Sequence, residues 1–402
     1  MIFSKRANQL VASATMNATL KAQNQIKNGE DIVLGSVGEP DSKPPSSTKK
    51  EVINYLNTHD SKYGSAQGLA STRKIISTWM NQLYKQNWSS ENVVISPGSK
   101  FGLYSLFQIL GDETCEVIIP SPYWVSYVTL AKLSGASIQV IPCSASENYK
   151  LTAAKLKNEL SKKTKALTKI LLLNSPQNPT GAIYSKSELI ELAEVIAAHP
   201  DLMVICDDIY NQLIFSDDSR CPHLLDVLDK EHHQRVILVH GASKSFALTG
   251  WRLGWVIASS EIINKLTDFQ SQTLTCMPDF IQIALEKTLQ NENQYVNELK
   301  ELIKIRHQRA ISILQTCPGI KLFSSQGAFY VWMEVLDKSK TSSQICDELL
   351  NQFGVALVPG SSFGCEYHLR FSVTISDTLL DKGLQRIINY FTLNGNPDQI
   401  KK

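Results

Sequence analysis

Short apolar runs alternate with helical patterns through the middle of the chain. The runs are Val93–Ile95, Glu116–Ile119, Ile138–Ile141, Ile170–Leu173 and Met203–Cys206, and each is short enough to be a buried strand. The alternation predicts a mostly parallel sheet that helices cover on both faces. Ligands of such sheets bind beyond the carboxyl ends of the strands, so residues with chemical functions are expected directly after each run.

Two further apolar runs, Val236–Val239 and Leu253–Ala258, flank a polar loop. Helices are predicted at Lys49–Thr58 and Phe101–Leu110, and an S-x-x-E capping box at Ser185–Glu188 begins another helix. The sheet is therefore expected to extend beyond the five strands of the alternating region.

The last quarter of the chain predicts a second, smaller unit. A charged run from Asn291 to Arg309 is typical of a long solvated helix, and we expect it to connect two domains. The elements expected beyond it are a strand at Phe329–Val335, a helix at Ser342–Phe353, strands at Val355–Val358 and His368–Val373, and a closing helix.

The composition excludes several classes of protein. With 402 residues, 43% of them hydrophobic, the chain can bury a large core in two domains. A net charge of +2 without a basic block argues against a nucleic-acid partner. The chain has no apolar run of about 18 residues and no apolar signal core, which argues against a membrane and favours the cytoplasm. The eight cysteines form no CxxC pair, so reduced core thiols are expected rather than disulfides or a metal site.

The loop between the last two runs carries one lysine, Lys244, and Arg252 opens the run that follows it. A lysine held between buried strands loses hydration, which lowers its pKa and suits it to form a Schiff base with a carbonyl group. The guanidinium of Arg252 suits a phosphate. Together the two residues suggest pyridoxal phosphate (PLP), although these residues alone leave a solvated loop lysine as the alternative.

The segment GASKSFALTGWRLG, residues 241–254, resembles the cofactor-lysine segment of the class I, fold-type I PLP-dependent aminotransferases, especially their bacterial aspartate-aminotransferase-like branch. The motifs GEPD, NSPQNPTG, DDIY, PGSSFG and LRFSVT stand in that family's order along the chain. The resemblance implies an α/β fold with a mostly parallel seven-stranded sheet in a large PLP-binding domain, residues 46–290. It also implies a smaller α+β domain made of residues 1–45 and 291–402, and a homodimer with shared active sites.

Five residues are candidates for holding the cofactor phosphate. Gly98, Ser99 and Lys100 lie at the N-terminus of a predicted helix, where free N–H groups and the helix dipole favour an anion. Every helix has such an end, so this feature alone is weak. The resemblance adds Ser243 and Arg252 to the phosphate group.

Four residues that follow the strands are candidates for the cofactor ring. The resemblance implies that Trp124 stacks on the pyridine ring and that Asn178 donates its amide to the phenolic oxygen or to the substrate carboxylate. A buried Asp207 is costly unless paired, and a protonated ring nitrogen would pair it; Tyr210 could bond the phenolic oxygen. A core role for Trp124 and a helix-capping role for Asp207 stay open. The family usually has Glu where this chain has Asp208, which we expect to be a solvent-side change with little consequence.

Three more residues complete the candidate site. Gly38 allows close backbone approach, and the resemblance implies that it contacts the substrate. The residues of the GEPD motif alone favour an ordinary Gly-Pro turn. Arg370 stands in mid-strand and is implied to grip the substrate α-carboxylate; a structural salt bridge is the alternative. Tyr63 is implied to reach the neighbouring subunit's phosphate, whereas a lone loop tyrosine is usually structural.

The resemblance implies an aminotransferase with a ping-pong mechanism. Lys244 would hold PLP and then act as the general base at the substrate Cα, Asp207 would keep the ring nitrogen protonated, and Tyr210 would tune the linkage to the cofactor. Two alternatives remain. A PLP-dependent lyase or cyclase could share this fold, and a non-catalytic PLP-binding regulator would need an appended DNA-binding domain.

The expected substrates are an L-amino acid, aspartate and also aromatic ones, and a 2-oxo acid such as 2-oxoglutarate. Relatives often carry Lys-Pro where this chain has Val11 and Ala12. Residues 267–283 contain no arginine, although the eukaryotic-type aspartate aminotransferases place their side-chain-binding arginine there. The preference for aspartate therefore rests on the resemblance, and the apolar Val11 beside a Tyr123–Trp124 wall favours a broader range.

Overall fold

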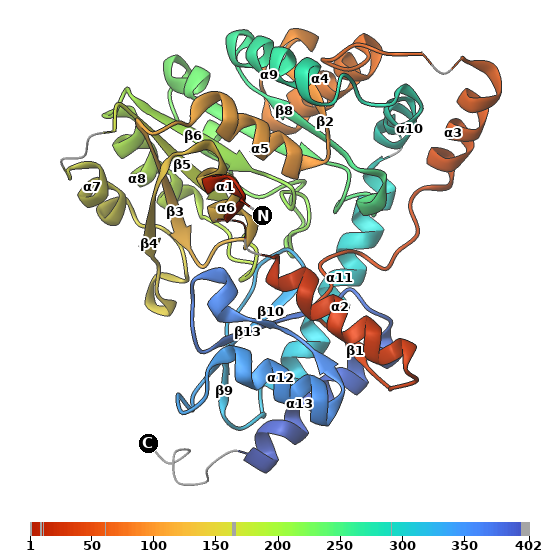
Figure 1. Cartoon of the computed structure of the whole chain (residues 1–402), viewed down its shortest axis with the longest axis vertical. Helices are drawn as coiled ribbons and strands as arrows, with labels where there is room; N and C mark the ends of the chain where they lie inside the picture. Colours follow the sequence, from red (N-terminus) through yellow and green to blue (C-terminus); the bar gives the residue numbers. More distant parts are fainter. Residues whose placement is uncertain are drawn as a thin grey trace.

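The computed structural model describes residues 2–8, 10, 12–60, 62–162, 166–290 and 292–394, and its central element is a seven-stranded sheet (Figure 1). The strands are β2 (Val93–Pro97), β3 (Cys115–Ser121), β4 (Ser137–Pro142), β5 (Thr168–Asn174), β6 (Leu202–Asp207), β7 (Val236–Gly241) and β8 (Leu253–Ile257). Their spatial order is β2-β8-β7-β6-β5-β3-β4. The strand β8 is antiparallel to β2 and β7, whereas β3 to β7 pair in parallel, which confirms the predicted mostly parallel sheet.

Helices cover both faces of this sheet. The first face packs against α4 (Ala70–Tyr84), α7 (Ala153–Leu160), α8 (Lys186–Ala197) and α10 (Asp279–Gln290). The second face packs against α5 (Ser99–Leu110), α6 (Ser126–Ser134) and α9 (Ser260–Thr273). Neighbouring strand residues such as Ile118 and Ile119 enter opposite apolar layers, because successive side chains of a strand point to opposite faces.

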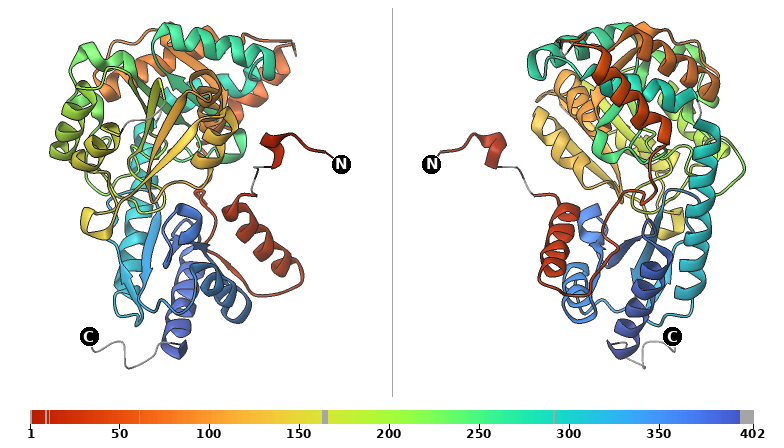
Figure 2. Two further views of the ribbon diagram at one scale, coloured as in Figure 1. Left: turned by 60° about the vertical axis from the view of Figure 1, so that its left-hand side comes forward. Right: turned by 90° about the vertical axis from the view of Figure 1, so that its right-hand side faces the viewer.

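A second unit is built around a four-stranded antiparallel sheet with the order β12-β13-β10-β9. Its strands are β9 (Ile320–Leu322), β10 (Tyr330–Val335), β12 (Val358–Pro359) and β13 (His368–Ser372), and β1 (Val33–Leu34) pairs in parallel with β11 (Val355–Ala356) beside it. The remaining helices are α1 (Lys5–Asn8), α2 (Ala14–Lys27), α3 (Ser46–Thr58), α11 (Glu292–Leu314), α12 (Ser342–Phe353) and α13 (Asp377–Asn394). Figure 2 shows α11 running alongside both units and α1 standing away from the rest of the chain.

Short 3-10 helices connect the larger elements. They are η1 (Ser90–Asn92), η2 (Ala145–Glu147), η3 (Leu224–Asp226), η4 (Lys230–Arg235), η5 (Thr249–Trp251) and η6 (Gly360–Phe363). The capping box at Ser185 and Glu188 is present at the start of α8, as predicted.

The observed elements differ from the expected ones mainly where strands are very short. The run predicted as one strand at Val355–Val358 is interrupted at Leu357, and its two halves, β11 and β12, pair with different partners. The strand β9 was not predicted, since three residues give no alternation to recognise.

Two further properties bear on the expectations. The eight cysteines are free thiols and six of them are buried, as expected of core residues. Within the described ranges, every helix is too short or too polar to span a bilayer.

Candidate active site

A cavity of about 320 Å³ lies at the carboxyl ends of β5, β6 and β7, next to β10 and β13 of the second unit. Its volume is in the range of small-molecule sites. The sequence-predicted residues that line it are Gly38, Ser99, Lys100, Trp124, Asn178, Asp207, Tyr210, Ser243, Lys244, Arg252 and Arg370. Segments far apart in the sequence therefore meet at the edge of the sheet where ligands are expected.

Lys244 lies in the turn after β7 with its side chain directed into the cavity. Its Nζ donates a hydrogen bond of 2.6 Å to the carbonyl oxygen of Gly38. Burial lowers the pKa of Lys244 to about 8, although the carboxylate of Glu39 acts in the opposite direction. Part of the population is therefore a free amine near neutral pH, which is the form that attacks carbonyl groups.

One end of the cavity is suited to an anion. The helix α5 begins at Ser99, so its free backbone N–H groups point toward this end. Gly98 has a φ of +81°, and a Cβ built there would overlap Nη2 of Arg252. Arg252 itself has the uncommon φ of +55°, and its Nη1 is anchored to the carbonyl oxygen of Thr249 at 2.9 Å.

Lys100 supplies a second cation near this end. Its Nζ lies 4.9 Å from the centre of the Trp124 ring, a cation–π distance. Burial, and then the charge of Arg252, lower the pKa of Lys100. A carboxylate entering the cavity would restore favourable electrostatics for this ammonium group.

Asp207 ends β6 and is 3% exposed. The hydroxyl of Tyr127 donates a hydrogen bond of 2.6 Å to its Oδ2, and its carbonyl oxygen accepts one of 2.7 Å from the Asn174 side chain. Burial raises the pKa of Asp207 to about 6, against the effect of the Tyr127 hydrogen bond. Such a carboxylate is ready to accept a proton or to pair with a cationic ring nitrogen.

The expectation that Asp208 lies on the solvent side is wrong. Asp208 is 2% exposed, and its Oδ2 accepts a hydrogen bond of 2.7 Å from the hydroxyl of Tyr84 on α4. The reason is geometric: Asp207 and Asp208 point to opposite faces, and helices cover both faces of this sheet.

Arg370 is 1% exposed on β13. Its guanidinium donates to Oδ1 of Asn178 at 3.0 Å and to the carbonyl oxygen of Ser36 at 2.9 Å, and it lies 4.3 Å from the centre of the Tyr330 ring. Among the residues that the structure describes, no carboxylate pairs with Arg370, which excludes the structural salt bridge considered from the sequence. A buried guanidinium with only neutral partners is suited to bind a substrate carboxylate.

Several functional candidates escaped the sequence reasoning. The hydroxyl groups of Tyr330 and Tyr210 share a hydrogen bond of 2.7 Å. A Cβ at Gly38 would lie 2.9 Å from the hydroxyl oxygen of Tyr330. Tyr127 stands three residues after Trp124 at the start of α6, a spacing that could have placed it on the same helix face. Thr15 on α2 lines the cavity with a buried hydroxyl that lacks a partner, and no sequence signal marks it.

One predicted contributor lies outside the cavity, and another is not among the described residues. Tyr63 is 88% exposed and does not line the cavity within one chain. Val11, to which a broader substrate range was attributed, lies outside the described residues.

The residues present fit PLP. Lys244 offers an amine of lowered pKa for the aldehyde, Asp207 offers a buried carboxylate for the ring nitrogen, and the α5 N-terminus with Arg252 offers an anion site for the phosphate. The described residues contain no group of three or more His, Cys, Asp or Glu that could hold a metal ion. Fold and site together define a fold-type I PLP-dependent enzyme.

Comparison with known proteins identifies the family. Residues 30–387 match the model of the family described as aminotransferase class I and II. The aspartate aminotransferase of Bacillus sp. (strain YM-2) is 32% identical over 391 residues, covering 96% of this chain and 98% of that protein. The probable aspartate/prephenate aminotransferase of Rickettsia felis is 30% identical, covering 96% of this chain and 95% of that protein.

Solved structures agree with the sequence comparison. The aspartate aminotransferase of Thermus thermophilus with maleate superposes with a TM-score of 0.90 at 28% identity, covering 97% of this chain and all of that one. The enzyme of Thermotoga maritima gives 0.89 at 31% identity, with 97% of this chain and 100% of that chain covered. The chain belongs to the class I and II aminotransferases, and it is a PLP-dependent enzyme that transfers amino groups.

Proposed function

We propose that this aminotransferase takes its amino group from aspartate in preference to other L-amino acids, accepts aromatic amino acids more slowly, and passes the group to a 2-oxo acid such as 2-oxoglutarate. The observation that carries the preference is the pair of cations in the cavity, Lys100 and Arg370, which can bind two carboxylates of one substrate.

Lys244 and Asp207 carry the chemistry in this proposal. The bound cofactor supplies an aldehyde for the amino group and a ring that withdraws electrons from the substrate Cα. Lys244 would hold the cofactor, and its amine, once free, would remove the proton from the substrate Cα. Asp207 would keep the ring nitrogen protonated, and Tyr210 would donate its hydroxyl hydrogen to the phenolic oxygen.

Arg370 and Asn178 orient the substrate. Arg370 offers two parallel N–H groups to the α-carboxylate. The carboxylate replaces the neutral oxygens of Asn178 and Ser36, which accept hydrogen bonds from Arg370 in this structure. Trp124 forms one wall of the ring pocket, and the backbone of Gly38, free of a Cβ beside Tyr330, leaves room for the substrate. These contacts are common to all amino acids and set no preference among them.

We assign Lys100 to the acidic side chain of the substrate rather than to the phosphate, for which the sequence made it a candidate, and Lys100 then sets the preference for acidic substrates. Its ammonium lies over the Trp124 ring at the cavity wall, where burial and the charge of Arg252 lower its pKa, so a second carboxylate that enters the cavity pairs favourably with it. The names of the relatives support this choice, as does the dicarboxylate maleate in the Thermus structure. The aromatic ring of Trp124 beside Lys100 supports slower use of aromatic amino acids.

A single-turnover panel tests the substrate proposal. The absorbance of the bound cofactor is followed after mixing with aspartate, glutamate, alanine, phenylalanine or tyrosine. We expect the acidic substrates to react faster than alanine, and Lys100→Met to slow aspartate by at least about tenfold while leaving alanine within about twofold. Rates for aspartate and glutamate no faster than for alanine would refute the acidic preference, and undetectable rates for phenylalanine and tyrosine would refute the aromatic activity. Ammonia released without an acceptor would instead identify a lyase.

We further propose that the enzyme is a homodimer of the cytoplasm in which Tyr63 completes the phosphate site of the neighbouring subunit. The 88% exposure of an aromatic side chain outside its own cavity supports this role. The eight free cysteines support a reducing compartment. We propose the same domains as from the sequence, residues 46–290 and residues 1–45 with 291–402, and the separation of the seven-stranded sheet from the four-stranded one supports this division.

A further inference from the structure

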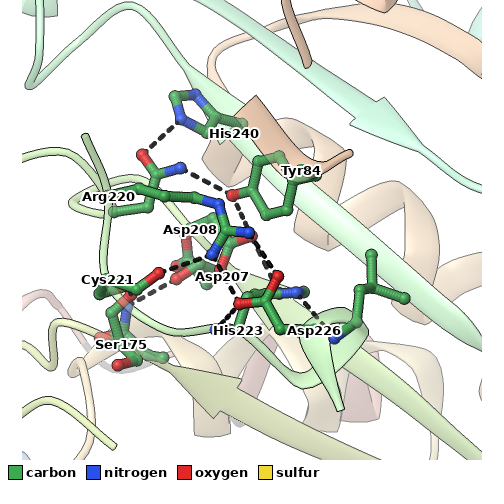
Figure 3. A network of polar contacts seen from close by, with 12 residues as sticks. Tyr84, Ser175, Asp207, Asp208, Arg220, Cys221, His223, Asp226 and His240 are labelled. Atoms are coloured by element: carbon green, nitrogen blue, oxygen red, sulfur yellow. Dashed lines mark hydrogen bonds and ion pairs between the residues drawn. The ribbon is translucent and has the colours of Figure 1, made fainter. Parts of the chain in front are cut away.

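A buried polar network surrounds Asp208 (Figure 3). Its centre is Asp208, whose Oδ2 accepts the hydroxyl hydrogen of Tyr84 at 2.7 Å and lies 3.2 Å from Nε2 of His223. Asn211 in turn donates to the hydroxyl oxygen of Tyr84 at 2.7 Å. Every one of these four side chains is nine-tenths or more buried. Tyr84 belongs to the helix layer on one face of the sheet, whereas Tyr127, the partner of Asp207, belongs to the layer on the other face.

The carboxyl group of Asp208 is ionised. Burial alone would raise its pKa, but the His223 ring and the Tyr84 hydrogen bond outweigh burial and hold the pKa of Asp208 below its usual value. A buried carboxylate is tolerated only with such compensation. The network therefore contains a buried negative charge at Asp208.

The neighbouring groups stabilise this charge. Nδ1 of His223 accepts the backbone N–H of Leu225 at 3.2 Å, which leaves Nε2 of the ring facing Asp208. Nδ1 of His240 likewise accepts from Gly241, and burial lowers the pKa of His240 to about 4. Tyr84, Asn211 and the His240 ring therefore stabilise the network by hydrogen bonds and dipoles, whereas His223 also acts on Asp208 by charge.

The remaining ionisable neighbours also leave the charge in place. Arg220 lies 4.6 Å from the centre of the Tyr84 ring, but its guanidinium is engaged by both carboxylate oxygens of Asp226, at 2.5 and 2.9 Å. Burial raises the pKa of Cys221 to about 12 and that of Cys206 well above its usual value, so both thiols are neutral. Neither thiol therefore adds charge beside the carboxylate of Asp208.

This charge is next in sequence to the carboxylate that the proposed function assigns to the ring nitrogen. Asp207 and Asp208 are separated by one peptide unit in a low-dielectric layer, where charges interact more strongly than in water. The charge on Asp208 adds to burial in raising the pKa of Asp207. A second negative charge at this position favours any cation in front of Asp207.

We propose that Asp208 is a positioning residue for the cofactor, whose charge acts through Asp207 to keep the ring nitrogen protonated and whose hydrogen bonds hold the Asp207 turn in place. The inference rests on the proposed role of Asp207. It also explains a second set of contacts: Asn211 accepts from Nε2 of His240 at 2.9 Å, which ties the Asp207 turn to the end of β7, directly before the Lys244 loop.

Affinity for two cofactors tests the inference without measuring turnover. Apoenzyme is titrated with PLP and with the analogue in which CH replaces the ring nitrogen, and the ratio of the two dissociation constants measures the interaction with that nitrogen. In Asp208→Asn, an isosteric change that removes the charge, we expect the ratio to fall by about tenfold, one pKa unit. The analogue's own affinity should stay within about twofold.

Two charge-retaining variants are the controls. Asp208→Glu, the residue usual in the family, and Tyr84→Phe, which removes one hydrogen bond, should both keep a ratio closer to that of the wild type. If the Asn variant does not fold, Asp208→Ser provides the same comparison, because it leaves room for water beside Tyr84.

The outcomes separate the inference from the function on which it rests. A wild type that does not distinguish the two cofactors overturns the role of Asp207 and the inference with it. If the wild type and Asp208→Asn show the same ratio of the two dissociation constants, the inference alone is overturned. Equal losses in Asp208→Asn and Tyr84→Phe would also overturn it, since packing rather than charge would then be responsible.

Discussion

At the scale of single residues, burial sets the proton affinities of the two groups that the chemistry uses. It lowers the pKa of Lys244 to about 8 and raises that of Asp207 to about 6, so both groups are less charged than exposed lysine or aspartate would be. The shifted pKa values of these two groups therefore lower the stability of the folded apoenzyme until the cofactor binds. A cofactor with an aldehyde and a basic ring nitrogen relieves both effects.

The cost at Asp207 predicts a pH-dependent stability of the apoenzyme. Its folded pKa, about 6, lies above the reference value of 3.8, so the native state binds the proton more tightly than the unfolded state does. The associated stability is fully present below pH 3.8 and is lost as the pH rises through 6. At pH 7 Asp207→Asn should therefore stabilise the apoenzyme by up to about 3 kcal/mol, measured by urea unfolding.

The same variant should gain little stability at pH 4, where Asp207 is protonated in the native state. Lys244, with a pKa of about 8, titrates mainly above this range in both proteins, so most of its contribution cancels in the comparison. Equal stabilisation at both pH values would contradict the prediction, because the effect could not then come from titration of this carboxyl group.

Arg370 provides a second prediction at this scale. Replacing its planar fork with a point charge in Arg370→Lys should weaken every amino acid substrate by roughly 1.5–3 kcal/mol, the range for hydrogen bonds to charged groups. The reason is that the α-carboxylate is common to all of them. The measurement is kcat/KM for aspartate, alanine and phenylalanine. A loss confined to aspartate would instead place Arg370 at the side-chain carboxylate.

At the scale of elements, the junction between β2 and α5 shapes the phosphate end. The strand ends at Pro97 and the helix starts at Ser99, so the chain turns sharply at Gly98 with a φ of +81°. Most residues disfavour this conformation, and any side chain here would press on the guanidinium of Arg252.

Gly98→Ala should therefore weaken PLP binding by about tenfold or more, since backbone strain and a displaced Arg252 act together. The measurement is equilibrium binding of PLP to the apoenzyme. Gly250→Ala is the matched control, because a Cβ at Gly250 meets nothing within 4 Å. Similar losses in both variants would show that the effect is not specific to the phosphate end.

Periodicity in the sequence predicts the elements well where they are long and buried. All seven strands of the large sheet were expected, because each contributes an apolar run such as Ile170–Leu173 between polar loops. The edge at which Asp207 and Lys244 meet follows from the same pattern. What the sequence does not reveal is the face that a polar residue occupies: Asp208 was placed in solvent although a second layer of helices covers it. Contributions from distant segments, such as Thr15 and Tyr330, depend on tertiary contacts that no local pattern encodes.

At the scale of the whole molecule, the site is complete only when both units meet. The hydrogen bonds Tyr210–Tyr330 and Asn178–Arg370 each join a residue of the large-sheet region to one on the four-stranded sheet. Residues of both bonds line the cavity. On the proposed role of Arg370, a substrate carboxylate would replace its contact with Asn178, and substrate binding would then be coupled to the relative position of the units.

The proposed sharing of sites between two chains gives the last prediction. Tyr63→Phe subunits keep Lys244 but lack the hydroxyl that we assign to the neighbour's phosphate, whereas Lys244→Ala subunits keep Tyr63 but lose the catalytic amine. The Lys244→Ala homodimer should be slower than wild type by several orders of magnitude. In a mixed dimer, Lys244 of one subunit meets the intact Tyr63 of the other, so one fully wild-type site forms. Mixing the two variants under conditions that exchange subunits should therefore restore activity above that of either parent.

Hybrid formation is verified by mass spectrometry of the intact dimers, with differently tagged subunits. If Tyr63 acts on its own chain's site, each site of the hybrid lacks either Tyr63 or Lys244, and activity stays between those of the parents. A Tyr63→Phe homodimer with wild-type affinity for PLP would contradict the role of the hydroxyl itself, whichever chain supplies it. Recovered activity in verified hybrids, together with weaker PLP binding by Tyr63→Phe, is the combination that only a shared phosphate site produces.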